Sequence, residues 1–146
     1  MSTETTTAFK PKKSVALSGT SAGNTALCSV GKSGNDLHYR GYDILEFADK
    51  AEFEEIAYLI VHEKLPNVAE LKAYKEKLRS YRDIPNGVKV ALEQLPKTCH
   101  PMDVMRTGCS VLGALNQEKE EHPKNEAQDI IDRLMGSFSS ILLYWY

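Results

Sequence analysis

The sequence lacks three features that would place the protein in a special class. No apolar run approaches the roughly 20 residues of a membrane-spanning helix, and residues 1–13 lack the apolar stretch of a secretory signal. The three cysteines are odd in number and form no Cys-x-x-Cys pair, which favours reduced thiols over disulfides. The formal net charge of −2 provides no basic field for nucleic acid or an anionic membrane. We therefore expect a cytoplasmic protein that binds neither membranes nor nucleic acid.

Metal ligands at a recognisable spacing are also missing. No two histidines lie four residues apart, and none has a cysteine or carboxylate at the spacing typical of zinc sites. The four histidines are His38, His62, His100 and His122. We therefore expect no metal site.

Two short motifs suggest hydrolysis or phosphate binding, but their context argues against both. Gly19–Gly23 matches G-x-S-x-G, which requires a helix after it, whereas the next residues have the pattern of a strand. Gly31-Lys32-Ser33 is similar to the end of a P-loop, but Ala26 stands where that motif needs an earlier glycine. We interpret the first match as chance and the second as a turn.

The length of 146 residues corresponds to one domain or part of one. The polar composition of residues 1–14 predicts a flexible N-terminal arm, which leaves residues 15–146 for the folded part. Thr25–Val30 and Leu37–Arg40 have strand-like patterns, and Gly31–Asn35 supplies the small residues of a turn between them. This arrangement predicts a β-hairpin.

Beyond Asp43 the apolar residues recur at helical spacing. Asp43 and Asn67 are expected N-caps, each with a glutamate three residues later, and Pro101 fits the first position of a helix. Further helices are expected from Pro85-Asn86 to Leu95 and from Asn125 or Glu126 onward. The predicted fold class is mainly α, with a small N-terminal β-hairpin.

The last predicted helix has an unusual ending. Toward Tyr146 it becomes apolar on all sides, which is typical of a helix buried all round. It also lacks the glycine, asparagine or basic residues that commonly end a helix. We expect the chain to be truncated within this helix.

The predicted helix Pro101–Asn116 is thin. Gly108, Ser110 and Gly113 keep its side chains small, although a glycine inside a helix costs up to ~1 kcal/mol relative to alanine. Close approach of another backbone would give a reason for these residues.

Several segments resemble the citrate synthase family. They are Tyr39–Ile44, Leu65-Pro66, His100–Gly108 and Ser139–Tyr146. The similarity extends over nearly the whole chain after Lys12 and is greatest to bacterial 2-methylcitrate synthases. It implies the N-terminal part of a multi-helical citrate synthase-type large domain, because family members are much longer than this chain.

The resemblance also implies an activity for the intact protein. Enzymes of this family condense an acyl-CoA with oxaloacetate, using one aspartate and two histidines. In the 2-methylcitrate branch, propionyl-CoA, oxaloacetate and water give 2-methylcitrate and CoA, in the methylcitrate cycle of propionate catabolism. Acyl-CoA is then a substrate, and no cofactor is implied. None of the catalytic residues maps onto this chain, so we name none and expect the fragment to be inactive.

Two residues are candidates for substrate binding. His100 begins a helix and could lie in an active-site wall, and the guanidinium of Arg106 suits a carboxylate or a phosphate. The alternatives are that His100 caps its helix and that Arg106 pairs internally with Asp43, Asp103 or a helix C-terminus. The same internal pairing is the alternative for Arg40.

The resemblance places the helix Pro101–Asn116 in the interface of a homodimer. The interface residues implied are Met105, Gly108, Val111, Leu112 and Leu115. Two other interpretations stay open. One is a citrate synthase that uses acetyl-CoA, and the other is a non-catalytic helical module that dimerises through this face.

Overall fold

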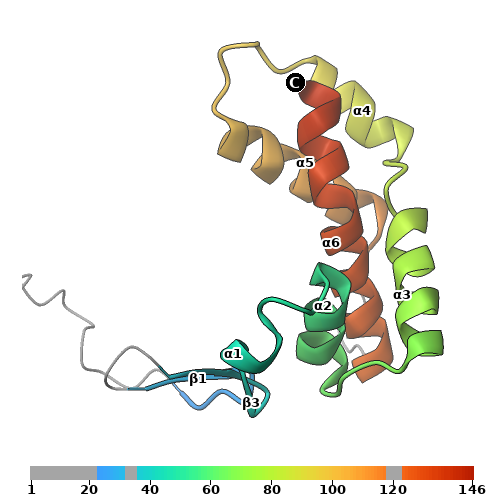
Figure 1. Ribbon diagram of the computed structural model, residues 1–146. Helices are drawn as coiled ribbons and strands as arrows, with labels where there is room; N and C mark the ends of the chain where they lie inside the picture. The colour runs from blue at the N-terminus through green and yellow to red at the C-terminus, as the bar shows by residue number, and fades with distance from the viewer. Residues whose placement is uncertain (1–22, 32–35, 118–122) are drawn as a thin grey trace, which may run out of the picture.

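The computed structural model describes residues 23–31, 36–117 and 123–146. Within these ranges the chain is mainly helical with one small sheet, which confirms the predicted fold class (Figure 1). The predicted arm of residues 1–14 lies outside the described residues. The helices are α1 Ile44–Phe47, α2 Phe53–His62, α3 Val68–Ser80, α4 Asn86–Glu93, α5 Pro101–Leu115 and α6 Lys124–Trp145.

The described sheet contains one strand more than the predicted hairpin. Its strands are β1 Cys28–Val30, β2 Leu37–Tyr39 and β3 Tyr42–Asp43, antiparallel in the order β1-β2-β3. Arg40 and Gly41 connect β2 to β3 with φ angles of 50° and 89°. Tight two-residue hairpin turns require such positive angles. The third strand escaped the sequence analysis because it is only two residues long.

Local capping explains where the first helices begin. Asp43 accepts a hydrogen bond from the Leu45 N–H at 2.9 Å and starts α1. Glu52 and Glu55 form a reciprocal capping box that starts α2, so the helical stretch after Asp43 divides in two. The predicted cap of α3 is confirmed, because Asn67 and Glu70 exchange two hydrogen bonds of 2.9 Å.

Helix α6 is the element around which the other large helices pack. It contacts α3 and α2 along one part of its length and α4 and α5 along another (Figure 1). The larger apolar cluster joins α4, α5 and α6 through the buried side chains of Ile84, Val88, Leu92, Val104, Leu112 and Ile141. The smaller one joins α2 and α3 and consists of Ala57, Tyr74 and Leu78. The sheet and α1 lie to one side of the helices, next to α2 (Figure 1).

A close approach at Gly108 occurs within this chain, but a side chain makes it rather than the predicted backbone. A Cβ atom at Gly108 would lie 2.5 Å from Cγ2 of Ile141, which belongs to α6. Gly108 and Leu112 are both buried. The thin part of α5 therefore accommodates α6, and these two residues are not available to a second copy in this structure.

The prediction that the end of α6 is buried on all sides is wrong for this chain. Ile141 is fully buried, whereas Leu143 is 74% exposed and Tyr146 is 98% exposed. Only the face toward α4 and α5 is covered, because no other described element lies against the opposite face.

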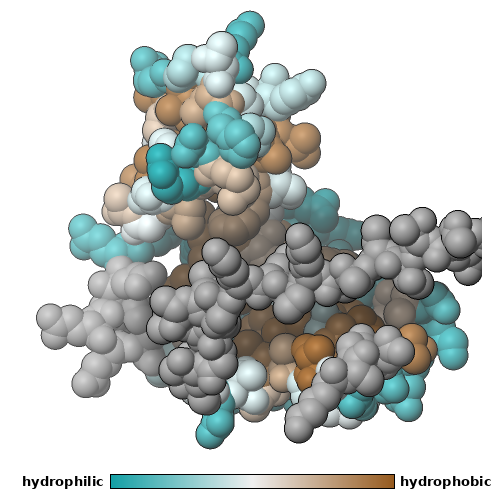
Figure 2. All heavy atoms as spheres, turned by 90° about the vertical axis from the view of Figure 1, so that its left-hand side faces the viewer, coloured by the Kyte–Doolittle hydropathy of each residue, from teal (hydrophilic) through white to brown (hydrophobic). Residues whose placement is uncertain are grey.

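Hydrophobic residues also gather on part of the surface. Figure 2 shows them in a recess between the upper and lower parts of the molecule, with hydrophilic residues toward the periphery. Contiguous apolar surface of this kind is typical of contact regions between proteins or domains. None of the described helices has the length and apolarity needed to cross a bilayer.

Candidate functional site

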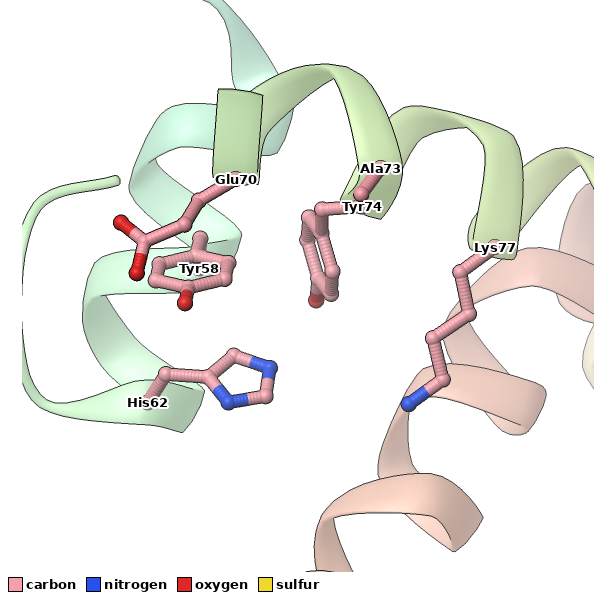
Figure 3. Close-up of a pocket in the computed structure, with 6 residues that line it drawn as sticks. All are labelled: Tyr58, His62, Glu70, Ala73, Tyr74 and Lys77. Atoms are coloured by element: carbon pink, nitrogen blue, oxygen red, sulfur yellow. The ribbon is translucent and has the colours of Figure 1, made fainter. Parts of the chain in front are cut away.

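A cavity of about 230 Å³ lies between α2 and α3 (Figure 3). Helical spacing brings its walls together, because Tyr58 and His62 are four residues apart on α2, and Tyr74 and Lys77 are three apart on α3. Glu70 and Ala73 of α3 complete the lining. Titratable side chains of two helices therefore meet in one place.

The aromatic rings of the cavity are in direct contact. Tyr58 stacks on His62 with ring centroids 4.3 Å apart, and Tyr74 presents its edge to both at 5.2 and 5.4 Å. Such separations are normal for packed aromatic pairs. The three rings therefore form one packed wall of the cavity.

A buried carboxylate from α6 lies beside the cavity. The side chain of Asp132 is fully buried. Its Oδ1 accepts a hydrogen bond from the Tyr74 hydroxyl at 2.7 Å, and its Oδ2 accepts one from the Lys77 ammonium at 2.7 Å. Lys77 also donates to Asp129. A buried charge of this kind is stable only when it is paired, and here two residues of α3 supply the partners.

His62 is close to this carboxylate but not bonded to it. Its Nε2 lies 3.8 Å from Oδ2 of Asp132, which is beyond hydrogen-bond distance. This nitrogen is buried and has no hydrogen-bond partner among the described residues. Burial lowers the pKa of His62, an effect that the Asp132 carboxylate partly offsets.

Three other polar groups of the cavity, Tyr74, Lys77 and Glu70, have pKa values shifted away from neutral pH. Burial and the hydrogen bond to Asp132 raise the pKa of Tyr74. Burial acts to lower the pKa of Lys77, but its hydrogen bonds to Asp129 and Asp132 outweigh that effect and raise it. The hydrogen bond from Lys64 and that from the Asn67 N–H lower the pKa of Glu70. The arrangement is a polar anchor between helices rather than a set of free acids and bases.

The predicted substrate residues lie elsewhere, at the start of α5. His100 is the N-cap of α5 and accepts a hydrogen bond from the Met102 N–H at Nδ1, at 3.1 Å. Arg106 is exposed and pairs with Asp103 at 3.1 Å. Both alternatives considered from the sequence, a cap and an internal ion pair, are therefore present. Neither residue lines the cavity between α2 and α3, and their role in substrate binding stays a prediction.

Arg40 also has the internal role proposed as its alternative. Its guanidinium donates two hydrogen bonds, of 2.8 and 3.2 Å, to the Ile60 carbonyl near the end of α2. It lies 3.6 Å from the carboxylate of Glu63. The turn after β2 is thereby anchored to the carboxyl end of α2.

The predicted dimer residues divide into two groups. Gly108 and Leu112 are buried, and Met105 and Val111 are half-buried and pack against the α4–α5–α6 core. Leu115 is 53% exposed, although it also lies over Gly87 of α4. A dimer interface on α5 stays a prediction, with Leu115 as its most accessible member.

Sequence reasoning missed Asp132, His62 and Lys77 as members of one cluster. Asp132 carried a usable signal, because it is four residues before Gly136 and nine before Ile141, on the buried side of α6. A charged residue on an apolar face predicts a buried partner. Its partners could not be identified, because Lys77 and Tyr74 lie 55 and 58 residues away in the chain. Within the described ranges, no group of three potential ligands suits a metal ion.

A family model and a curated relative that match this chain agree on one family. Residues 16–146 match the family model described as "Citrate synthase, C-terminal domain". A 2-methylcitrate synthase from Shewanella oneidensis is 53% identical over 130 residues, which are 89% of this chain and 34% of that protein.

Solved structures agree with the sequence relatives. The citrate synthase of Thermotoga maritima is 30% identical, with a TM-score of 0.75 over 90% of this chain and 33% of that one. A ternary complex of Thermoplasma acidophilum citrate synthase with carboxymethyl coenzyme A and oxaloacetate is 27% identical, with a TM-score of 0.79 over 89% and 34%. The chain thus spans about a third of the length of these relatives.

Proposed function

The chain belongs to the citrate synthase family, and from this premise we propose that it forms part of a 2-methylcitrate synthase. The intact enzyme would condense propionyl-CoA with oxaloacetate and water, giving 2-methylcitrate and CoA in propionate catabolism. Acyl-CoA would be a substrate, and no bound cofactor would be required. We place the enzyme in the cytoplasm and expect it to act as a homodimer.

The observation that carries this proposal is the 53% identity to a 2-methylcitrate synthase over 89% of the chain. The described residues fit a scaffold role, because most of their clustered polar side chains form hydrogen bonds and ion pairs with other groups of this chain. Asp132 is bonded to Tyr74 and Lys77, and His100 caps α5. We propose that the residues that make and break bonds belong to other parts of the intact enzyme, and that the 146 residues are inactive alone.

A second candidate is a citrate synthase that uses acetyl-CoA. It is favoured by the solved structures, because both neighbours described above are named citrate synthases. The two reactions differ by one methylene in the acyl group. A hydrophobic pocket discriminates a methylene by roughly 10- to 200-fold in kcat/KM.

Release of the CoA thiol tests the two candidates. The intact protein that contains this chain is supplied with oxaloacetate and with either propionyl-CoA or acetyl-CoA. We expect kcat/KM to be at least about tenfold higher for propionyl-CoA. A higher value for acetyl-CoA supports the second candidate, and no thiol release from either donor argues against both.

The 146-residue chain is assayed beside it. We expect no thiol release above the blank, and measurable turnover would show that the catalytic groups lie within these residues.

Substitution of Arg106 by Ala in the intact enzyme tests substrate binding. A raised KM with unchanged stability supports that role, whereas unchanged kinetics indicates only the ion pair with Asp103.

A further inference from the structure

His62 is the residue of the α2–α3 cavity whose ordinary pKa lies closest to neutral pH. Its buried Nε2 has no hydrogen-bond partner among the described residues. The nearest carboxylate oxygen, Oδ2 of Asp132 at 3.8 Å, already accepts from Lys77, and Oδ1 accepts from Tyr74. A neutral imidazole suits this position, because its unprotonated nitrogen requires no acceptor.

Protonation of His62 would add a hydrogen-bond donor at Nε2, where both oxygens of the nearest carboxylate already accept hydrogen bonds. An imidazolium has two N–H donors, and the one at Nε2 would compete with the Lys77 ammonium for the same oxygen of Asp132. The charged groups and phenols that face His62 come from α2 and its carboxyl end, from α3 and from α6. They are Tyr58, Lys64, Glu70, Tyr74, Lys77, Asp129 and Asp132. Burial and the two ammonium groups oppose protonation, the carboxylates of Asp129 and Asp132 favour it, and the resulting pKa is lowered.

Helix α2 is attached to the rest of the molecule by few buried side chains. Only Ala57 and Leu59 of α2 are buried. The carboxyl end of α2 is held by polar contacts, since Arg40 donates to the Ile60 carbonyl and Gln128 donates to the Val61 carbonyl at 3.0 Å. Regions with few buried apolar contacts are the ones that open at low free-energy cost.

We propose that His62 is a proton-sensitive latch. Protonation of its imidazole releases α2, with the sheet that Arg40 anchors to it, from α3 and α6, while the α4–α5–α6 core stays closed. In the closed state the pKa of His62 is lowered, whereas in the open state it returns to about 6.5. The closed state is therefore fully stable above pH 6.5 and is destabilised as the pH falls from 6.5 toward the closed-state pKa, with a limiting slope of about tenfold per pH unit in the opening equilibrium.

Amide hydrogen exchange tests the latch. Protection of the 146-residue chain is measured between pH 7.5 and pH 5 and corrected for the pH dependence of intrinsic exchange. We expect opening of Phe53–His62 to increase as the pH falls from 6.5 toward the closed-state pKa of His62, with a limiting slope of about tenfold per pH unit, while Asn86–Glu93 stays unchanged. Equal loss of protection in both helices would overturn the proposal, because it would indicate global unfolding.

Two variants separate His62 from the other histidines. His62→Gln, which cannot be protonated near neutral pH, should remove the pH dependence of α2 opening. His100→Asn preserves a capping side chain on α5 and should leave that dependence intact. Persistence of the dependence in His62→Gln would assign it to another group and overturn the proposal.

Proton NMR of the imidazole rings gives a measurement that does not depend on the folding of a variant. In the wild-type chain we expect the His62 ring to titrate with a midpoint below 6.5. A midpoint above 6.5 would mean that protonation strengthens the contact with Asp132, which is the opposite of the proposed release.

Discussion

Along α6, residues 124–132 meet α2 and α3 mainly through polar groups, whereas Ile141 and Trp145 meet α4 and α5 through apolar side chains. The polar half contains the Asp132 carboxylate with its Tyr74 and Lys77 partners. The apolar half has the larger of the two clusters. The stability of apolar packing depends on the shape and volume of the side chains, whereas the stability of a buried charge depends on each of its hydrogen-bond and ion-pair partners. The two halves of one helix should therefore respond differently to substitution, pH and salt.

The largest effect is expected from a cavity in the apolar half. Leu92→Ala removes a fully buried side chain of α4 and should lower the free energy of unfolding by about 3–4 kcal/mol. Urea unfolding followed by circular dichroism measures the change. Val90→Ala on the same helix is the control, because Val90 is 48% exposed and should change stability by less than about 0.5 kcal/mol. Equal effects of the two substitutions would mean that α4 does not pack as described.

A charge deletion gives the corresponding test of the polar half. Asp132→Ala leaves the Tyr74 hydroxyl and the Lys77 ammonium without their buried acceptor and should destabilise the chain by about 3 kcal/mol. Asp129→Ala removes only the exposed partner of Lys77 and should cost less than about 1 kcal/mol. The same urea experiment compares them. If Asp132→Ala has the smaller effect, the polar half is not held by this carboxylate.

Two glycines of α5 test the packing of the apolar half at atomic scale. Gly108→Ala would place Cβ 2.5 Å from Cγ2 of the buried Ile141 and should cost about 1–3 kcal/mol. Gly113→Ala meets no atom within 4 Å and should stabilise the helix by up to about 1 kcal/mol. Thermal unfolding of both variants should therefore shift in opposite directions. A loss of stability in Gly113→Ala would show that its face of α5 is covered.

The smallest effect is expected at the exposed start of α6. Lys124 donates to the carboxylate of Glu63 at 2.7 Å, and both side chains are largely exposed. Lys124→Ala should cost about 0.5 kcal/mol or less at low salt, and the difference should vanish near 1 M salt because exposed charges are screened. Urea unfolding of the wild-type chain and of Lys124→Ala at two salt concentrations measures the difference in stability. A difference that persists at high salt would place the pair in a buried environment.

Much of the fold could be predicted from the sequence because its signals are local. Asn67 and Glu70 start α3 through bonds that span three residues, and Pro101 follows the capping His100 at the start of α5. The division between α1 and α2 was harder to predict. It depends on Glu52, a residue type that is not among the preferred N-caps.

The candidate site could be predicted only in part. The internal roles of His100 and Arg106 were among the alternatives considered from the sequence, because an N-cap and an ion pair three residues apart are local. For Arg40 the sequence offered a helix C-terminus as a partner but could not identify α2, because Ile60 lies 20 residues away. The small residues of α5 predict a close approach at Gly108, and Ile141 of α6 makes it in this structure, whereas a dimer interface on α5 stays a prediction. Helical periodicity identifies a packing face but does not identify what packs against it.

The sequence by itself determined most of the secondary structure of this protein, apart from β3 and the break between α1 and α2, and, through its motifs, its membership of the citrate synthase family. The tertiary structure alone decided that Asp132 meets Tyr74 and Lys77, and that His62 stands 3.8 Å from the same carboxylate. The reason is the range of the forces involved. Caps and helical faces are fixed by neighbours a few residues apart, whereas the environment of a buried charge is created by helices that meet only after the chain has folded.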